Sequence, residues 1–181
     1  EDGSLEIPLF ASDIDGDVLI FTADADDNSS VSIVDNILTV SPAANYNGSL
    51  SITAYVSDDE YTDSTTFTVT VTPINDAPIL TQIESQSIDE GGVLELTLSA
   101  TDIDAGDTLS YEVTSSSSSE VEVDGDQLTI TPQENYNGSF DVTVLVSDQG
   151  GLSDSQIFTL TVNPVNDPPV IEDVSNQQVA E

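Results

Sequence analysis

The sequence lacks every cationic side chain: it has no lysine, arginine or histidine, against 35 aspartates and glutamates. The formal net charge of −35 excludes nucleic acids and anionic membranes as partners, because both carry charge of the same sign. Without histidine, lysine or cysteine, the usual general bases, nucleophiles and Schiff-base formers of enzymes are missing. The remaining possibility for catalysis is chemistry that needs carboxyl groups alone, such as the two carboxyl groups of a glycosidase.

Cysteine is also absent, which excludes disulfides and thiolate metal sites. Without histidine as well, the metals that remain are those with oxygen ligands, Ca²⁺ and Mg²⁺. No apolar run approaches the roughly 18 residues that a membrane span needs. No signal peptide is visible at Glu1, and the sequence starts and stops abruptly, so we expect a piece of a longer protein.

Apolar residues, which make up 37% of the chain, alternate with polar ones. The alternation has a period of two in "LELTLSA" (94–100), "QLTITP" (127–132), "FDVTVLVS" (140–147) and "IFTLTV" (157–162). This pattern is typical of strands with one buried face, and the Ile, Val, Leu and Thr in these stretches favour strands. Because the apolar residues alternate in this way, the acidity does not indicate disorder here. No helical pattern of convincing length is present.

The chain repeats itself at an interval of about 90 residues. "PAANYNGSLSITAYVSD" (42–58) matches "PQENYNGSFDVTVLVSD" (132–148), and "DSTTFTVTVTPINDAPIL" (63–80) matches "DSQIFTLTVNPVNDPPVI" (154–171). Each copy predicts about seven strands separated by Gly, Asn, Asp and Pro. We therefore expect an all-β fold of two tandem seven-stranded Greek-key β-sandwiches, joined by a short extended Asn-Asp-x-Pro linker. The expected boundaries are 1–76 for the first repeat, 77–167 for the second, and 168–181 for the first strand of a following repeat.

Acidic residues gather at the expected strand ends and linkers rather than on the alternating faces. Asp102 and Asp104 are two residues apart, so on an extended chain both carboxylates point to one side, where they repel each other unless water or a metal separates them. Each motif taken alone has a plainer explanation: a solvated polar turn, a turn-forming Asp, or ordinary linker composition. Because the motifs recur together in both copies, we favour a Ca²⁺ site, which takes six to eight oxygen ligands.

The stretch "IDEGGVLELTLSATDIDAGDTLSYEV … VLVSDQGGLSDSQIFTLTVNPVNDPPV" resembles a cadherin-type repeat. Cadherin modules carry a glutamate near the first strand, a DxD pair, an Asp after the sixth strand and an Asn-Asp linker. The "P-x-x-N-Y-N-G" and "N-D-x-P" elements are more similar to the cadherin-like tandem repeats of large bacterial surface and secreted adhesins. The likeness covers essentially the whole chain.

The resemblance implies Ca²⁺ bound between consecutive modules. The complete junction would use Glu1, Asn75, Asp76, Asp102, Asp104 and Asp148, with Asn45, Asn47 and Asp107 as weaker candidates. Two half junctions would use Glu90, Asn166 and Asp167 at one end and Asp13, Asp15 and Asp58 at the other. Asp24 and Asp26 in "ADADDN" could form a separate surface site, although a solvated loop explains them as well.

The chain departs from animal cadherins in two places. The first acidic position of the linker is lost, and "NYNG" stands roughly where cadherins have an Asp-Arg-Glu element, so we expect only about one or two ions per junction. The function implied is a non-enzymatic, calcium-rigidified extracellular spacer or adhesion repeat, with neighbouring repeats as its partners. The alternative is a module that recognises a glycan or a second copy of itself through its loops. A carboxylate glycosidase is disfavoured because the repeats contain no insertion that could form a pocket.

Overall fold

The computed structural model describes residues 1–117, 119–173 and 175–179, and their secondary structure consists of strands without helices. The chain divides into two compact units, Glu1–Asn75 and Asp76–Glu181. Since no described residue is helical, no helix long and apolar enough to span a membrane occurs there. The expectation of an all-β protein is confirmed.

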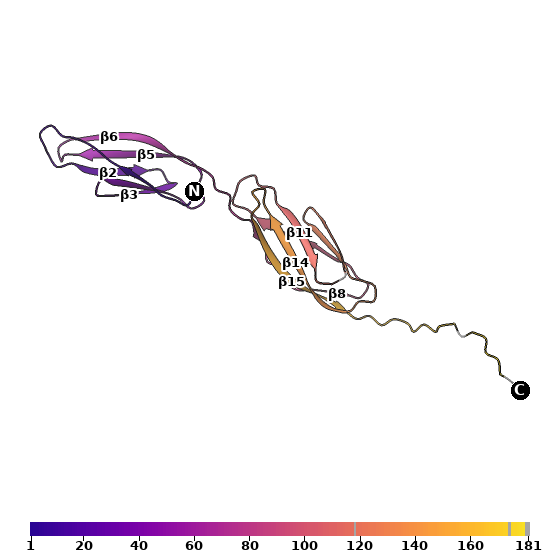
Figure 1. Cartoon of the computed structure of the whole chain (residues 1–181). Coiled ribbons are helices and arrows are strands. Elements are labelled where there is room, and N and C mark those ends of the chain that lie inside the picture. Colours follow the sequence, from indigo (N-terminus) through magenta and orange to yellow (C-terminus); the bar gives the residue numbers. More distant parts are fainter. Residues whose placement is uncertain (118, 174, 180–181) are drawn as a thin grey trace. The chain divides into compact units, whose positions relative to one another are not determined.

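The first unit is a sandwich of two three-stranded antiparallel sheets. One sheet has the order β1-β4-β3 and the other β2-β5-β6, and Figure 1 shows β2, β5 and β6 in the same layer. The bounds are β1 (Leu5–Pro8), β2 (Ile20–Ala25), β3 (Ser29–Val34), β4 (Ile37–Pro42), β5 (Gly48–Ser57) and β6 (Thr62–Val71). Alternate residues of β4 and β5, namely Leu38, Val40, Leu50 and Ile52, are completely buried between the sheets, as the period of two predicts.

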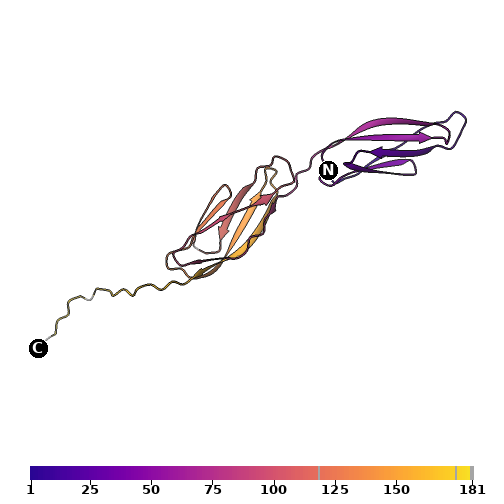
Figure 2. The same cartoon turned by 180° about the vertical axis from the view of Figure 1, so that it is seen from behind.

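The second unit repeats this arrangement and adds two short strands at its start. Its sheets have the orders β11-β14-β15-β8 and β12-β13-β9, and a separate pair joins β10 to β7. The long orange strands β14 and β15 run side by side in Figures 1 and 2. The bounds are β7 (Ile79–Leu80), β8 (Gln86–Asp89), β9 (Leu94–Thr97), β10 (Ala100–Thr101), β11 (Ser110–Ser115), β12 (Glu120–Asp124), β13 (Gln127–Thr131), β14 (Gly138–Ser147) and β15 (Ser153–Asn163).

Strands β1 to β6 correspond to β9 and β11 to β15, and β10 has no counterpart in the first unit. If β7 and β8 count as one interrupted strand, and β9 and β10 as another, the second unit has the expected seven. The first unit has six, because residues 1–75 contain no counterpart of the segment 77–89 that forms β7 and β8. The first unit thus has one strand fewer than predicted.

The repeated "NYNG" motif forms a turn before β5 and before β14. Asn45 and Asn135 adopt positive φ angles of 56° and 58°, which asparagine tolerates better than most residues. Gly138 has a φ of 135°, and a Cβ there would lie 3.3 Å from the hydroxyl of Tyr136, so the close approach of the ring requires glycine. The motif is thus accounted for by backbone geometry.

Residues 164–173 and 175–179 contain no strand. Their counterparts β7 and β8 pair with β10 and β15, which follow them within the same repeat. No such partners follow residue 168 in this sequence, so the assignment of 168–181 to the first strand of another repeat stays a prediction, as do the exact repeat boundaries. Val174, Ala180 and Glu181 lie outside the described residues.

Candidate metal centre

Three aspartates of the second unit converge in the loop between β10 and β11. Asp102, Asp104 and Asp107 each place one carboxylate oxygen within 4.8 Å of the others. The loop holds its shape partly because the main-chain N–H of Asp104 donates to Oδ1 of Asp102 at 2.9 Å. The other carboxylate oxygen of Asp102, Oδ2, is buried, as is Oδ2 of Asp107. Within the described part of the chain, these two oxygens have no hydrogen-bond partner.

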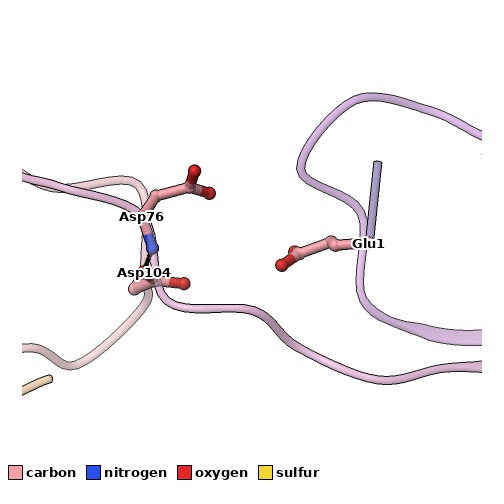
Figure 3. Close-up of side chains that lie close together, drawn as sticks. All are labelled: Glu1, Asp76 and Asp104. Carbon is pink, nitrogen blue, oxygen red and sulfur yellow. Dashed lines mark hydrogen bonds between the residues drawn. The ribbon is translucent and has the colours of Figure 1, made fainter. Parts of the chain in front are cut away.

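The start of the second unit is tied to the same loop. The main-chain N–H of Asp76 donates to Oδ2 of Asp104 at 2.7 Å, the bond drawn as a dashed line in Figure 3. A linker residue and the DxD pair of the same unit are therefore in contact, as expected if both contribute to one site. Glu1, also drawn in Figure 3, belongs to the first unit.

Asp148 follows the end of β14 and is only 8% exposed. Its Oδ1 accepts hydrogen bonds from the main-chain N–H groups of Gly151 at 2.6 Å and Leu152 at 2.8 Å. These bonds fix the turn that leads into β15. The negative charge of Asp148 is near enough to repel the carboxylate of Asp107. Asp148 therefore adds to the negative potential around the three aspartates of the loop between β10 and β11.

The pKa of Asp107 is raised above its usual value of 3.8. Loss of solvent around the carboxyl group is the largest cause, followed by repulsion from Asp102, Asp104 and Asp148. With no lysine, arginine or histidine in the chain, no side chain can neutralise this cluster. Oxygen ligands, partial burial and uncompensated negative charge fit a hard divalent cation, and Ca²⁺ fits better than Mg²⁺ where several carboxylates replace water.

Asp107→Asn is expected to stabilise the second unit when no divalent cation is present. Because the folded-state pKa is raised, ionised Asp107 costs stability at neutral pH, and that cost disappears as the pH falls below the unfolded-state value. Urea unfolding in EDTA at about pH 7 and about pH 4 measures both effects. Asp17→Asn, the exposed counterpart in the first unit, is the control and should change little. A destabilised or unchanged Asp107→Asn protein would contradict the repulsion argument.

A glutamate ties the end of each unit to its own linker. In the first unit, the carboxylate of Glu1 accepts hydrogen bonds from Nδ2 of Asn47 at 3.1 Å and from the N–H of Ile74 at 2.7 Å. These two bonds, the Ile74 bond above all, lower the pKa of Glu1. Glu90 makes the equivalent bonds with Asn137 at 3.3 Å and Val165 at 3.2 Å. Asn47 thus supports a glutamate through its NH₂ group, which sequence reasoning did not anticipate.

The first-unit counterparts of the acidic loop behave differently. Oδ1 of Asp13 accepts hydrogen bonds from the N–H groups of Asp15 at 2.8 Å and Asp17 at 3.1 Å, so the loop closes on itself. Asp58 accepts bonds from Tyr61 and Glu60, and these lower its pKa. Within residues 1–75, all described, no three carboxylates meet as Asp102, Asp104 and Asp107 do. "DIDGD" is one residue shorter than "DIDAGD", which changes where the last aspartate falls.

The remaining candidates are spread over the two units. Asn166 and Asp167 are exposed beyond β15. Asp24 lies on the exposed face of β2, whereas both oxygens of Asp26 accept hydrogen bonds, from Asn28 and Ser29 on one side and Ser51 on the other. The main-chain N–H of Asn45 donates to Asp2. A metal role for these residues stays a prediction.

The two sandwiches define a tandem immunoglobulin-like fold. A family model described as "Bacterial Ig domain" matches residues 1–72 and 75–161. The chain therefore belongs to the bacterial Ig domain family, and the expected fold is confirmed. No curated protein sequence matches it.

Solved structures support the same fold. The two-domain fragment EC1-2 of human protocadherin-24 is 19% identical with a TM-score of 0.57, over 90% of this chain and 88% of that one. Extracellular cadherin domains 1-5 of protocadherin gamma B2 are 21% identical with a TM-score of 0.56, over 86% of this chain and 35% of that one. An endo-fucoidan hydrolase of glycoside hydrolase family 107 is 22% identical with a TM-score of 0.42, over 92% of this chain and only 27% of that one.

Proposed function

We propose that this chain is a calcium-binding spacer segment of a larger extracellular protein, in which Ca²⁺ restricts movement between consecutive repeats. The observation that carries the proposal is the cluster of Asp102, Asp104 and Asp107, with two buried carboxylate oxygens that have no hydrogen-bond partner among the described residues. A buried charged oxygen is costly unless a cation or a donor compensates it. The chain contains no cationic side chain, so the compensating charge has to come from solution.

The ligands we propose come from both sides of the linker. Asp102, Asp104, Asp107 and Asp148 would provide carboxylates from the second unit, and Asn75 and Asp76 would provide linker oxygens. The cadherin resemblance adds Glu1 from the first unit. The bound ion would supply positive charge among these oxygens. The carboxylates, which repel one another without an ion, would then all coordinate the same cation.

With this set of ligands, Ca²⁺ binding would also restrict movement at the linker. If an ion takes oxygens from a linker and from the modules on either side, it binds best to one arrangement of them and so increases the population of that arrangement. Adhesion and an extracellular location are part of the proposal because the similar protocadherin structures are described as extracellular cadherin domains. We propose no catalytic role for the two units.

Small-angle X-ray scattering of the full chain tests the mechanical part. In EDTA we expect a broad distribution of particle dimensions, and in a few millimolar CaCl₂ (about 3 mM) a narrower distribution with a larger mean, because binding selects one linker conformation. The same concentration of MgCl₂ should do much less, because Mg²⁺ retains its water ligands.

The matched control is Glu1→Gln, which removes the first unit's carboxylate but leaves the second-unit cluster in place. It should still bind Ca²⁺, measured by calorimetry, while losing much of the change in scattering. Scattering curves of the parent chain that are identical in EDTA and CaCl₂ would overturn the spacer proposal. Calorimetry showing no binding would overturn the calcium site itself.

A further inference from the structure

Strand β3, which is labelled in Figure 1, lies at the edge of its sheet in the first unit. The order of the sheet is β1-β4-β3, so β3 pairs with β4 on one side only. Its counterpart β12 is also the last strand of its sheet, although the second unit contains β7 and β8. The edge position of β3 is therefore a property of the repeat and does not depend on those two strands.

The open side of β3 presents main-chain hydrogen-bonding groups. The hairpin between β3 and β4 turns through two residues, Asp35 and Asn36, whose φ angles of 51° and 63° are both positive, as a type I′ turn requires. In such a hairpin the two residues that flank the turn bond to each other, and the direction of the main-chain groups alternates from there. Val31 and Ile33 therefore direct their N–H and C=O groups away from β4, where another extended chain can pair with them.

The exposed side chains of β3 carry no charge, and this distinguishes β3 from β12. On β3 the residues directed to solvent are Ser30, Ser32 and Val34. At the equivalent positions β12 has acidic residues only, namely Glu120, Glu122 and Asp124. Charged side chains on an edge strand hinder pairing with the strands of other molecules. The edge of the second unit is protected in this way, and the edge of the first unit is not.

An apolar row continues from this edge across the outer face of the sheet. Val34 pairs with Ile37 of β4, which pairs with Pro8 of β1. Val34 is 69% exposed and Ile37 is 40% exposed. The corresponding row of the second unit is polar and also exposed, and consists of Asp124, Gln127 and Thr97. Since that row is exposed in a unit that has β7 and β8, those strands do not cover this face.

We propose that β3 of one copy of this chain pairs antiparallel with β3 of a second copy, which joins two three-stranded sheets into one sheet of six strands. Both copies use the same surface, so the contact has twofold symmetry and closes as a dimer. Pairing of extended segments at a sheet edge is an established mode of recognition, in which main-chain hydrogen bonds provide affinity. The contact is independent of the proposed Ca²⁺ site, which lies in the second unit and the linker.

The free main-chain groups define the register of this pair. The N–H of Ser29 already donates to the carbonyl of Asp26, so Val31 and Ile33 are the residues left to bond across the edge. Both are used when Val31 of one copy lies opposite Ile33 of the other. Ser32 then lies opposite Ser32 of the second copy, and Ser30 lies opposite Val34, so that the exposed side chains of both strands share one face.

The distribution of charge favours a second copy over a cationic partner. A cationic segment would be attracted more strongly to the acidic strand β12 than to β3. A second copy has the same net charge of −35, so it can approach closely only through a surface without acidic side chains. In β12 the same register would place Glu122 opposite Glu122, and Glu120 opposite Asp124, and like charges directly opposite each other are destabilising. Self-pairing is therefore possible at β3 and opposed at β12.

The contact should be weak and should strengthen with salt. Pairing of two short edge strands is expected to bury less than about 1,200 Å², the range of transient interfaces. Repulsion between the remaining charges of the two copies is screened at high ionic strength. The tests therefore use about 0.5 M NaCl, where the Debye length is below about 8 Å, and contain EDTA so that Ca²⁺ has no influence on the result.

Engineered cysteines test the register, because the chain has no cysteine of its own. Under mild oxidation Ser32→Cys should form a disulfide-linked dimer at least about tenfold faster than Ser30→Cys, because only the former places two thiols directly opposite each other. The two Ser30 positions would be about 13 Å apart along the strands. Glu122→Cys, the same position of β12, is the control in the second unit and should also react slowly. Equal rates for Ser32→Cys and either of the other two variants would overturn the proposed pairing.

Sedimentation equilibrium of the unmodified chain tests self-association directly. The average mass should rise at least about 1.5-fold as the protein concentration approaches about 1 mM. Ser32→Glu should keep the chain monomeric, and it should fold because β12 has Glu122 at the same position. Thr68→Glu, which adds the same charge on an exposed position of β6 in the other sheet, should still associate. A parent chain that stays monomeric, or a Ser32→Glu chain that associates equally well, would overturn the proposal.

The opposite change tests the role of charge at the second edge. The triple variant Glu120→Ser/Glu122→Ser/Asp124→Val gives β12 the exposed side chains of β3, so each chain should then have two edges that pair and should form species larger than a dimer. A triple variant that remains dimeric would contradict the charge argument. If the parent chain stayed monomeric but bound a tetralysine peptide, and Ser32→Glu changed that binding, the edge would be assigned to a cationic partner instead.

Discussion

Ca²⁺ at about 100 times its dissociation constant will raise the unfolding midpoint of the second unit by roughly 10–20 °C, and the double variant Asp102→Asn/Asp104→Asn will abolish that rise. Ligand binding at this ratio stabilises a folded state by about 2.7 kcal/mol. For a domain of about 100 residues, each kcal/mol moves the midpoint by roughly 4–8 °C. Calorimetric melting in EDTA and in CaCl₂ measures the difference directly.

The double variant has a second expected effect in EDTA. Removing two of the charges that repel Asp107 should leave the second unit at least as stable as the parent, because the repulsion no longer opposes folding. The variant and the parent should therefore be similar in EDTA and differ in CaCl₂. This pattern separates loss of a ligand from ordinary damage to the fold, which would lower the midpoint under both conditions.

Asp13→Asn/Asp15→Asn is the matched control, because it makes the same change in the same motif of the first unit. There Oδ1 of Asp13 accepts two main-chain hydrogen bonds, and no three carboxylates of that unit converge. We expect the calcium-dependent rise of the second unit to be retained. If both double variants abolished the rise equally, the site would not lie in the loop between β10 and β11.

Much of the fold could be predicted from the sequence because the local signals agree with one another. Strict alternation in "FDVTVLVS" gives the buried and exposed faces of β14, and the "NYNG" turn needs positive φ angles that Asn and Gly tolerate. The 90-residue repeat then transfers each assignment from one unit to the other. The first unit has six strands rather than seven because residues 1–75 align with residues 90–166 and contain no counterpart of 77–89, which the alignment of the two copies already shows.

The candidate site was less predictable than the fold. Asp102 and Asp104 could be selected from their spacing, since they form a DxD pair in a motif that recurs. Asp107 was the weaker candidate, yet it is the member whose pKa is raised. Its position depends on the path of the loop through Ala105 and Gly106, which spacing alone does not define. The same motif in the first unit forms a self-contained turn, so similarity of sequence did not guarantee similarity of geometry.

Each unit has its own hydrophobic core, so truncating a buried leucine should destabilise only the unit that contains it. Leu128→Ala should destabilise the second unit by about 2–5 kcal/mol, the usual range for truncating a buried leucine, and leave the first unit unchanged. Leu38→Ala at the equivalent position of β4 should do the reverse. Leu128 is 1% exposed and Leu38 is 0% exposed, and they belong to two separate clusters of buried side chains. Hydrogen exchange of individual backbone amides at increasing urea concentrations measures the stability of each unit separately.

The parent chain should itself unfold in two steps, with the first unit before the second. The first cluster has five buried hydrophobic residues and the described part of the second has twelve, including Leu80, Leu98 and Val146 around the β7 position. More buried apolar area gives more stability, so the first unit is the weaker one. Leu38→Ala should then separate the two steps further, whereas Leu128→Ala should bring them together. If either substitution shifted both steps equally, the units would share one cooperative core, contrary to their separate clusters.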